Sequence, residues 1–241
     1  KIKFKDRFYF MKIENLLDNN IYQDLRVNFP DERYFNQHDE FAKTLHDESE
    51  NFNEFIKNNQ SWDKFINTLK SKQFKNSLIN FFDIKNIYVD NSWKKFLPFF
   101  KKAKMSFCFN ISEKGGYSLP HTDSSRKLLS MVFFFVDDAW NEKNGGQVFL
   151  YKPIDPKYER NWRNKRIDKE YLEKIETVIP SPNKIYAFKK SKNSYHSVEP
   201  VTGYNQLKRK VLMINLIYEN KNDSPYNEKI SIIKKIKNKI I

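Results

Sequence analysis

Two side chains that can bind a metal lie two residues apart in SLPHTDSS (residues 118–125): His121 and Asp123. The apolar run LLSMVFFFV follows soon after and favours a buried β-strand. Residues i and i+2 of a strand point to the same face, so imidazole and carboxylate would lie side by side. His196, in the later stretch NSYHSVEPV, could join them from another strand. Two histidines and one carboxylate can hold a ferrous ion on one face and leave the opposite positions open.

The order of these residues is more specific than the His-x-Asp pair alone, which occurs often by chance. Gly145 and Gly146 open an apolar run between the pair and His196, and Arg209 opens the last apolar run, thirteen residues after His196. The chain has only four histidines. His38 and His46 fall in the polar N-terminal part and are interpreted as surface residues.

Short runs rich in aromatic and β-branched residues dominate the chain from about residue 83 and predict β-strands. Turn-forming stretches separate them, such as EKGG, KNGG, SPN and VTGYN. No helical pattern alternates with the runs, which favours a sandwich or jelly roll over a doubly wound sheet. The eight runs are NIYVD, KMSFCFNIS, LLSMVFFFVDD, GQVFLYK, ETVIP, KIYAFKK, SYHSVEPV and RKVLMINLIYE.

Residues 1–82 are predicted to be mainly helical. SWDKFINTLKS and FKNSLINFF space their large apolar residues three or four apart, as an amphipathic helix does. The chain is therefore expected to be mainly β with helical support (α+β). A helical region (1–82) would pack on a β core (83–219), and a lysine-rich amphipathic helix (220–241) would follow. That last helix is expected to dock on the domain, with contact to a membrane surface as the alternative.

Composition limits the class of protein. The 241 residues are 39% hydrophobic, with no run long enough to span a membrane and no secretory signal. Cys108 is the single cysteine, which excludes disulfide scaffolds and cysteine-rich zinc sites and fits a cytoplasmic location. The net charge of +14 comes mostly from lysine, without a basic block, so nucleic acid is not the expected partner.

Residues 104–219 resemble the iron(II)/2-oxoglutarate-dependent dioxygenases, specifically the prolyl-4-hydroxylase-like branch. The stretches that carry the resemblance are GGYSLPHTDSSRKLLSMVFFFVDDAW, NGGQVFLYKP, NKIYAFKKSKNSYHSVEPV and RKVLMINLIY. The resemblance implies a double-stranded β-helix (jelly roll) braced by the preceding helices. It also implies that His121, Asp123 and His196 bind iron and that Arg209 binds the distal carboxylate of 2-oxoglutarate.

The sequence departs from the family at the 2-oxoglutarate site. Many relatives carry a tyrosine on the strand after the His-x-Asp motif, where this chain has MVFFFV. Tyr117 and Tyr151 are the candidates for the hydroxyl that joins the arginine. Lys208 and Lys210 flank Arg209 and could replace it, but strand alternation and the planar guanidinium favour Arg209.

The implied reaction is hydroxylation of an unactivated C–H bond, with release of succinate and carbon dioxide and with ascorbate as a reductant. Asp123 favours hydroxylation, because relatives that halogenate have a small residue there. The prime substrate is expected to be a peptide or a small metabolite. The insertion 152–175, with Arg160, Trp162, Arg163 and Arg166, could form a lid over it, with a solvated surface loop as the alternative. The alternatives are a non-catalytic jelly-roll binding protein and a cupin-like iron enzyme that does not use 2-oxoglutarate.

Overall fold

The computed structural model describes residues 2–5, 8–90, 92–159 and 166–224. The helices are α1 (Asn19–Val27), α2 (Glu50–Lys57), α3 (Gln60–Lys70) and α4 (Lys72–Phe81). The strands are β1 (Ile2–Lys5), β2 (Phe8–Ile13), β3 (Asn36–Asp39), β4 (Ala42–His46), β5 (Ile87–Tyr88), β6 (Lys101–Ser112), β7 (Ser118–His121), β8 (Lys127–Phe134), β9 (Val148–Pro153), β10 (Leu172–Val178), β11 (Ile185–Lys189), β12 (Tyr195–Val198) and β13 (Arg209–Tyr218). Among these helices, none is long and apolar enough to cross a membrane.

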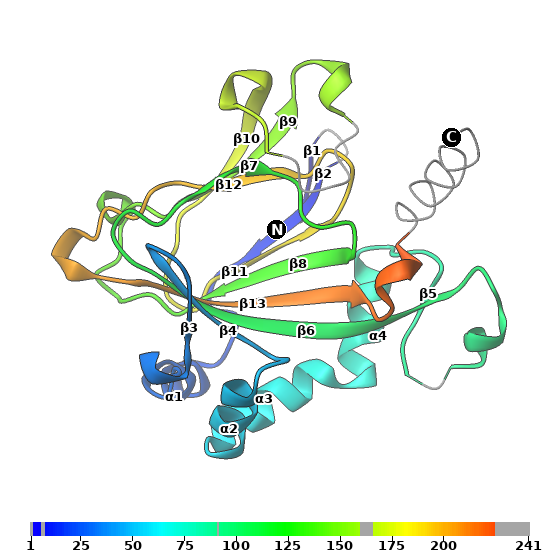
Figure 1. The fold of residues 1–241 in the computed structure, drawn as a ribbon, viewed down its shortest axis with the longest axis horizontal. Helices are drawn as coiled ribbons and strands as arrows, with labels where there is room; N and C mark the ends of the chain where they lie inside the picture. Colours follow the sequence, from blue (N-terminus) through cyan, green and yellow to red (C-terminus); the bar gives the residue numbers. More distant parts are fainter. Residues whose placement is uncertain (1, 6–7, 91, 160–165, 225–241) are drawn as a thin grey trace, which may run out of the picture.

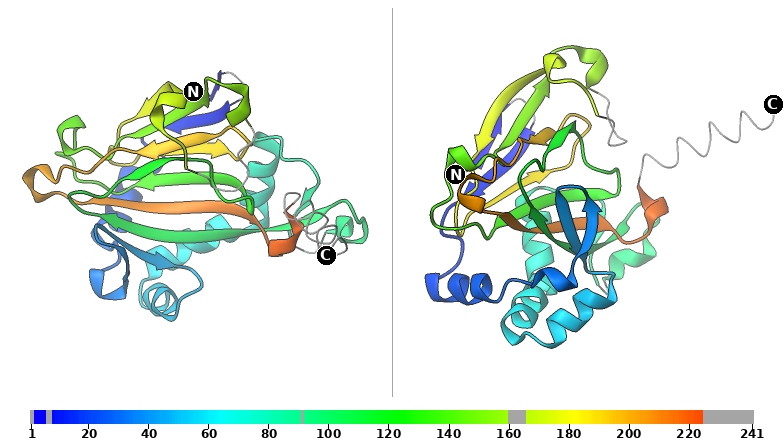
Figure 2. Two further views of the ribbon diagram at one scale, coloured as in Figure 1. Left: turned by 45° about the horizontal axis from the view of Figure 1, so that its top comes forward. Right: turned by 60° about the vertical axis from the view of Figure 1, so that its left-hand side comes forward.

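Two sheets of antiparallel strands face each other and form the predicted double-stranded β-helix (Figure 1). The large sheet runs in the order β1-β2-β11-β8-β13-β6-β4-β3, and β5 pairs with β6 in parallel. The small sheet runs β10-β9-β12-β7. Each of the eight apolar runs recognised in the sequence overlaps one of these strands. Figure 2 shows the helices on the face of the large sheet that points away from the small sheet.

Two hydrophobic layers follow from the alternation of side chains along the central strands. On β8, Phe133 faces the helices and Phe134 faces the small sheet. The helix-side layer is the larger and includes Phe52, Trp62 and Phe109. The layer between the sheets contains Val148, Leu150, Phe188 and Val211. Both faces of β8 are therefore buried, which explains why LLSMVFFFV is apolar throughout.

The expectation of a mainly helical region over residues 1–82 was wrong for four segments. β1 and β2 extend one edge of the large sheet, and the hairpin of β3 and β4 extends the other (Figure 1). The hairpin has the sequence NQHDEFAKTLH, in which β3 is exposed throughout. β4 is held by main-chain pairing to β6, and β3 by pairing to β4. Both carry little hydrophobic alternation, so no periodic signal identified them.

Part of two other predictions lies outside the described residues. Of the C-terminal helix expected over residues 220–241, the structure describes only 220–224. Within the insertion 152–175, residues 160–165 are not described, and these include Arg160, Trp162 and Arg163.

Replacement of Trp62 by Ala is expected to lower the free energy of unfolding by about 3–5 kcal/mol. The Trp62 side chain is fully buried, packs edge-on against Phe109 with ring centroids 4.8 Å apart, and donates from Nε1 to the carbonyl of Asn28 at 2.8 Å. Trp93, which is 68% exposed, supplies the matched control. Trp93→Ala should change stability by less than about 0.5 kcal/mol. Equal effects of the two changes in urea unfolding would refute this account of the helix-side layer.

Candidate iron and 2-oxoglutarate site

The two strand histidines are neighbours across the small sheet. His121 ends β7, His196 lies on β12, and the two are direct cross-strand partners. Their rings are 4.4 Å apart between centroids, and the ring of Phe188 on β11 packs 4.7 Å from that of His196. In each ring, Nδ1 faces a backbone carbonyl, that of Leu119 at 2.8 Å for His121 and that of Ser194 at 3.2 Å for His196. These contacts leave Nε2 of both rings available to a metal.

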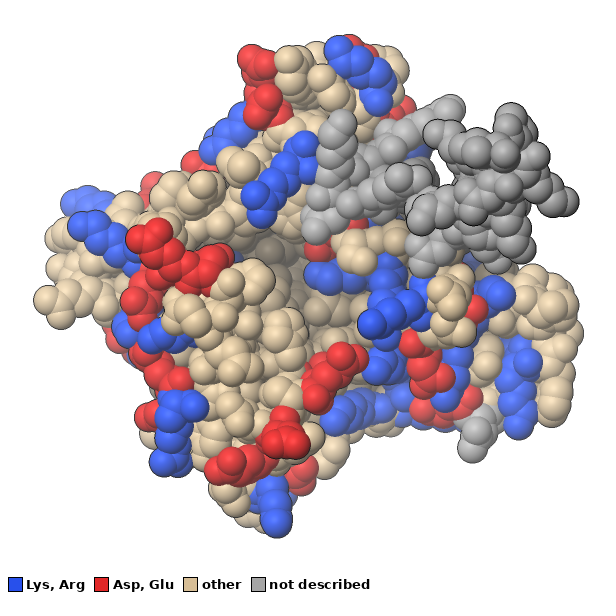
Figure 3. Space-filling view, viewed as in Figure 1, with Lys and Arg blue, Asp and Glu red and all other residues tan. Residues whose placement is uncertain are grey.

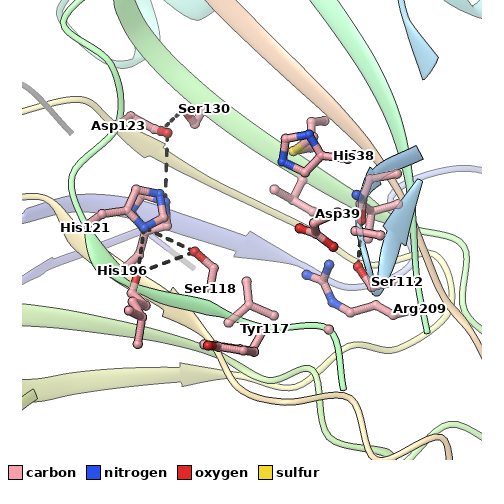
Figure 4. A pocket seen from close by; sticks show the side chains of 18 of the residues that line it. His38, Asp39, Ser112, Tyr117, Ser118, His121, Asp123, Ser130, His196 and Arg209 are labelled. Atoms are coloured by element: carbon pink, nitrogen blue, oxygen red, sulfur yellow. Dashed lines mark hydrogen bonds and ion pairs between the residues drawn. The ribbon is translucent and has the colours of Figure 1, made fainter. Parts of the chain in front are cut away.

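Asp123 completes the group from the turn between β7 and β8. One ligand atom from each of His121, Asp123 and His196 lies within 4.8 Å of the others, and Asp123 Oδ1 is 4.0 Å from His196 Nε2. Two donors orient the carboxylate: Lys127 Nζ at 2.8 Å from Oδ1 and Ser130 Oγ at 2.5 Å from Oδ2. Figure 4 shows the three side chains grouped on one side of the pocket.

The protonation states of these side chains suit a cation. Burial, followed by the neighbouring His121, lowers the pKa of His196 to about 3, and burial also lowers the pKa of His121. Burial by itself would raise the pKa of Asp123, but the ammonium of Lys127 and the two hydrogen bonds outweigh it and hold this pKa below its usual range. Two neutral imidazoles and one carboxylate are the forms in which these residues bind metal.

Arg209 lies at the opposite end of the same pocket, at the start of β13 (Figure 4). It is only 4% exposed. Its Nε donates to the carbonyl of Gly146 at 3.1 Å, and its guanidinium lies 5.2 Å above the ring of Phe134. No described residue supplies a carboxylate to its terminal nitrogens. Gly146 has φ +69°, and a Cβ there would come 2.7 Å from Arg209 Cδ, so glycine leaves room for the arginine.

The two lysines beside Arg209 point elsewhere, as alternation along the strand predicts. Lys208 Nζ lies 2.6 Å from Glu32 and 2.9 Å from Glu113, and Lys210 Nζ lies over the ring of Phe29 in the helix-side layer. Neither is among the residues that line the pocket. Of the three cations, Arg209 is the one that faces it.

The two tyrosines suggested from the sequence occupy different places. Tyr117 is 57% exposed and lines the mouth of the pocket. Tyr151 packs with Leu172 and Tyr195 in a separate cluster, and its hydroxyl shares a hydrogen bond of 2.9 Å with Ser197. The structure therefore brings Tyr117 to the pocket, and it places the hydroxyl of Tyr151 against the small sheet.

The cavity has a volume of about 630 Å³ and opens on the face shown in Figure 3, with acidic and basic side chains on its rim. The lining also includes residues that had no assigned role in the sequence analysis. Asp39 at the tip of the β3–β4 hairpin and Lys127 lie at the rim, and Tyr186 on β11 lies inside. His38, interpreted as a surface residue, also lines the cavity. Only pairing between distant strands brings the hairpin here, and no local pattern could show it.

The residues present fit a ferrous ion and an oxodicarboxylate. An N,N,O donor set surrounds one point, with both imidazoles neutral, which matches a facial triad. At the other end, a buried guanidinium lacks an anion among the described residues, and burying an unpaired charge is costly. A carboxylate ligand would remove that cost, and the fork geometry of arginine suits it.

The fold and the donor set together define the class of iron-dependent oxygenases that use an oxo acid. Residues 106–217 match the family model of the 2OG-Fe(II) oxygenase superfamily. This stretch of the chain is a 2OG-Fe(II) oxygenase domain, so the protein is a 2-oxoglutarate/Fe(II)-dependent oxygenase. Its cofactors are Fe(II) and 2-oxoglutarate.

Several solved structures are similar to this chain in fold. A Pseudomonas putida prolyl-4-hydroxylase is 12% identical with a TM-score of 0.50, covering 87% of this chain and 92% of its own. The protein IDO from Bacillus thuringiensis is 12% identical with a TM-score of 0.53, and the match covers 88% of this chain and 93% of IDO. The carbocyclase SnoK of nogalamycin biosynthesis is 9% identical with a TM-score of 0.54, and the match covers 87% of this chain and 80% of SnoK. No curated protein matches the sequence.

Proposed function

We propose that the protein hydroxylates an unactivated C–H bond, with His121, Asp123 and His196 as the iron ligands and Arg209 as the anchor of 2-oxoglutarate. The observation that carries the proposal is the arrangement of the pocket: two neutral imidazoles and one carboxylate at one end, and a buried arginine without an anionic partner among the described residues at the other. When bound, Fe(II) and 2-oxoglutarate supply the oxidation by dioxygen, which yields succinate and carbon dioxide. Asp123 supports hydroxylation over halogenation, because its carboxylate would hold the metal at a position that a halide would otherwise need.

The side chains and backbone of the protein position the metal ligands and shape the pocket. Lys127 and Ser130 hold the carboxylate of Asp123, and the carbonyls of Leu119 and Ser194 orient the two imidazoles. Val132, Phe188 and Val211 give the pocket apolar walls, which keep water from the reacting centre. Residues 1–82 brace the catalytic core of residues 83–219 through the helix-side layer.

The prime substrate, a peptide or a small metabolite, would lie in the cavity beside the His121, Asp123 and His196 side chains. The wall formed by the large sheet carries Asn110 and Ser112 on β6 and Asn215 on β13. Asp39 and Arg166 stand at the mouth. The described part of the insertion 152–175 thus contributes Arg166 to the entrance, which supports its role as a lid. A cytoplasmic location fits the single, buried and unpaired Cys108.

Purified protein given Fe(II), ascorbate and 2-oxoglutarate is expected to form succinate slowly even without a prime substrate. Some succinate should form without a substrate, because the cosubstrate site is formed before a substrate binds. The expected rate is a small fraction of the coupled rate. Succinate is measured by mass spectrometry, and the Asp123→Ala protein is the control. A screen of peptide and metabolite pools for a gain of one oxygen atom then identifies the substrate.

Complete absence of succinate with every pool, from protein that binds iron, would refute the enzymatic proposal. That outcome would favour the non-catalytic binding protein instead. Oxidation of a substrate without any need for 2-oxoglutarate would favour the cupin-like enzyme.

A further inference from the structure

The loop between β5 and β6 carries an aromatic surface that the catalytic pocket does not use. Trp93, Phe96 and Phe99 are 68%, 78% and 58% exposed, which makes them the three most exposed aromatic side chains among the described residues. None of them is among the residues that line the pocket. Figure 1 shows the loop standing out from the sheets on the side of the molecule where β6 begins. Large apolar side chains gathered in this way mark a binding surface.

Contacts at the base of the loop and within it explain why these rings point outward. At the base, Asp90 pairs with the buried Lys75 of α4, with Nζ and Oδ1 2.6 Å apart. Within the loop, the Ser92 hydroxyl accepts a backbone N–H at 3.3 Å and caps the short 3-10 helix Trp93–Phe96. The turn therefore projects its aromatic side chains away from the two hydrophobic layers of the fold.

Two lysines between the exposed rings have no anionic partner among the described residues. Lys94 Nζ lies 5.0 Å from the ring centroid of Phe100, and Lys95 Nζ lies 4.9 Å from that of Phe96. Neither ammonium forms an ion pair within the described chain, whereas Lys101, which follows directly after the loop, lies 3.7 Å from a carboxylate. The surface thus combines exposed aromatic rings with ammonium groups that are free to meet an anion.

The unpaired lysines decide between the possible occupants of this surface. A second copy of the chain would bring the same two ammonium groups against them, and each chain carries a net charge of +14. Residues 225–241, with the sequence PYNEKISIIKKIKNKII, contain five lysines and one glutamate, so they too would repel the loop. The occupant that complements the charge is therefore an anionic partner from outside the chain.

The size of the loop favours a lipid surface over an acidic protein. A stable protein interface buries about 1,200–2,000 Å² in total and uses about 20–30 residues on each side. The loop has nine residues, from Ser92 to Phe100, and stands out from the fold, so it supplies only part of such an area. A membrane surface makes a smaller demand, because aromatic side chains enter the headgroup region while lysines beside them meet anionic headgroups.

We propose that the loop of residues 92–100 binds the surface of an anionic phospholipid membrane, with its three exposed aromatic side chains among the headgroups and with Lys94 and Lys95 beside the phosphates. This association is separate from the chemistry of the pocket. It would concentrate the enzyme at a membrane surface without contributing a group to the reaction.

The charge of the loop is tested with the whole chain and with vesicles of phosphatidylcholine, either alone or with about one third phosphatidylglycerol. Wild-type protein should sediment with the anionic vesicles at least about tenfold more strongly than with the neutral ones. Lys94→Gln combined with Lys95→Gln should weaken anionic binding about tenfold or more, since each lysine near such a surface contributes about fivefold. Lys57→Gln combined with Lys64→Gln, exposed on α2 and α3, changes the net charge equally and should alter binding less than about twofold.

Insertion of the aromatic side chains is tested separately. Trp93→Ala, Phe96→Ala and Phe99→Ala together should weaken binding at least about tenfold, whereas Phe81→Ala, at an exposed position of α4, should change it less than about twofold. Brominated lipid in the vesicles should quench the fluorescence of Trp93, and Trp93→Phe should lose that quenching while it keeps most of the binding. The melting temperature and uncoupled succinate formation should stay near wild type in every variant, because these side chains lie outside the core and the pocket.

Vesicle binding that is unchanged in both the lysine and the aromatic variants would overturn the inference and assign the binding to another part of the chain. Absence of wild-type binding to the anionic vesicles would also overturn it and would favour an acidic protein as the partner. A wild-type dimer in sedimentation velocity that the aromatic variant dissociates, without a change in vesicle binding, would assign the surface to a second copy instead.

Discussion

Asp123→Ala protein is expected to lose iron binding by at least about 100-fold and to lose all hydroxylation. The carboxylate is the only anionic donor in the group, and even the loss of a residue that merely orients a ligand costs about 10–100-fold in affinity. His196→Ala should behave in the same way. Metal affinity is measured by anaerobic titration with Fe(II), and activity by the gain of one oxygen in the substrate.

The fold of Asp123→Ala protein should be retained, because Lys127 is 26% exposed through its side chain and can turn to water. Glu173→Ala is a suitable control. Glu173 forms a half-exposed ion pair with Lys152 on the outside of the small sheet, and such pairs contribute about 0–1 kcal/mol. An Asp123→Ala protein that binds iron as tightly as wild type and still hydroxylates would show the triad assignment to be wrong.

Arg209→Ala protein is expected to need roughly 100-fold or more 2-oxoglutarate, with unchanged iron affinity. A charge-assisted, bidentate pair in a buried site contributes a few kcal/mol, and about 1.4 kcal/mol corresponds to a tenfold change in Kd. Arg209→Met fills the space beside Phe134 without the charge and should show the same rise in the 2-oxoglutarate requirement. The measurement is the dependence of succinate formation on 2-oxoglutarate concentration, together with its Kd.

Lys208→Ala and Lys210→Ala are the matched controls on the same strand. Lys208 pairs with Glu32 and Glu113, and Lys210 lies over Phe29, so neither change should alter the 2-oxoglutarate requirement by more than about threefold. A steep rise in the 2-oxoglutarate requirement of either lysine variant, with that of Arg209→Ala near wild type, would assign the anchor to that lysine.

Local pattern alone determined much of the fold and part of the candidate site. Every apolar run from residue 86 onward overlaps a strand, because burial between layers requires apolar side chains and a strand repeats every two residues. The same period predicted the inward direction of Arg209, which the structure bears out, and the proximity of His121 and Asp123. The sequence did not indicate why position 146 is glycine, and the structure shows that the side chain of Arg209 packs against it.

Other features were decided by the tertiary structure, because they depend on which distant strands pair. The β3–β4 hairpin is polar and lies at the pocket mouth only because β4 pairs with β6. The sequence contains several tyrosines near the motif, and alternation cannot tell which hydroxyl meets the arginine. Tyr186 and Arg209 line the same cavity because β11, β8 and β13 are neighbours in the large sheet, although the two residues are far apart in the sequence. Side-chain direction is a local property of a strand, whereas the partner that a side chain meets is a property of the assembled sheets.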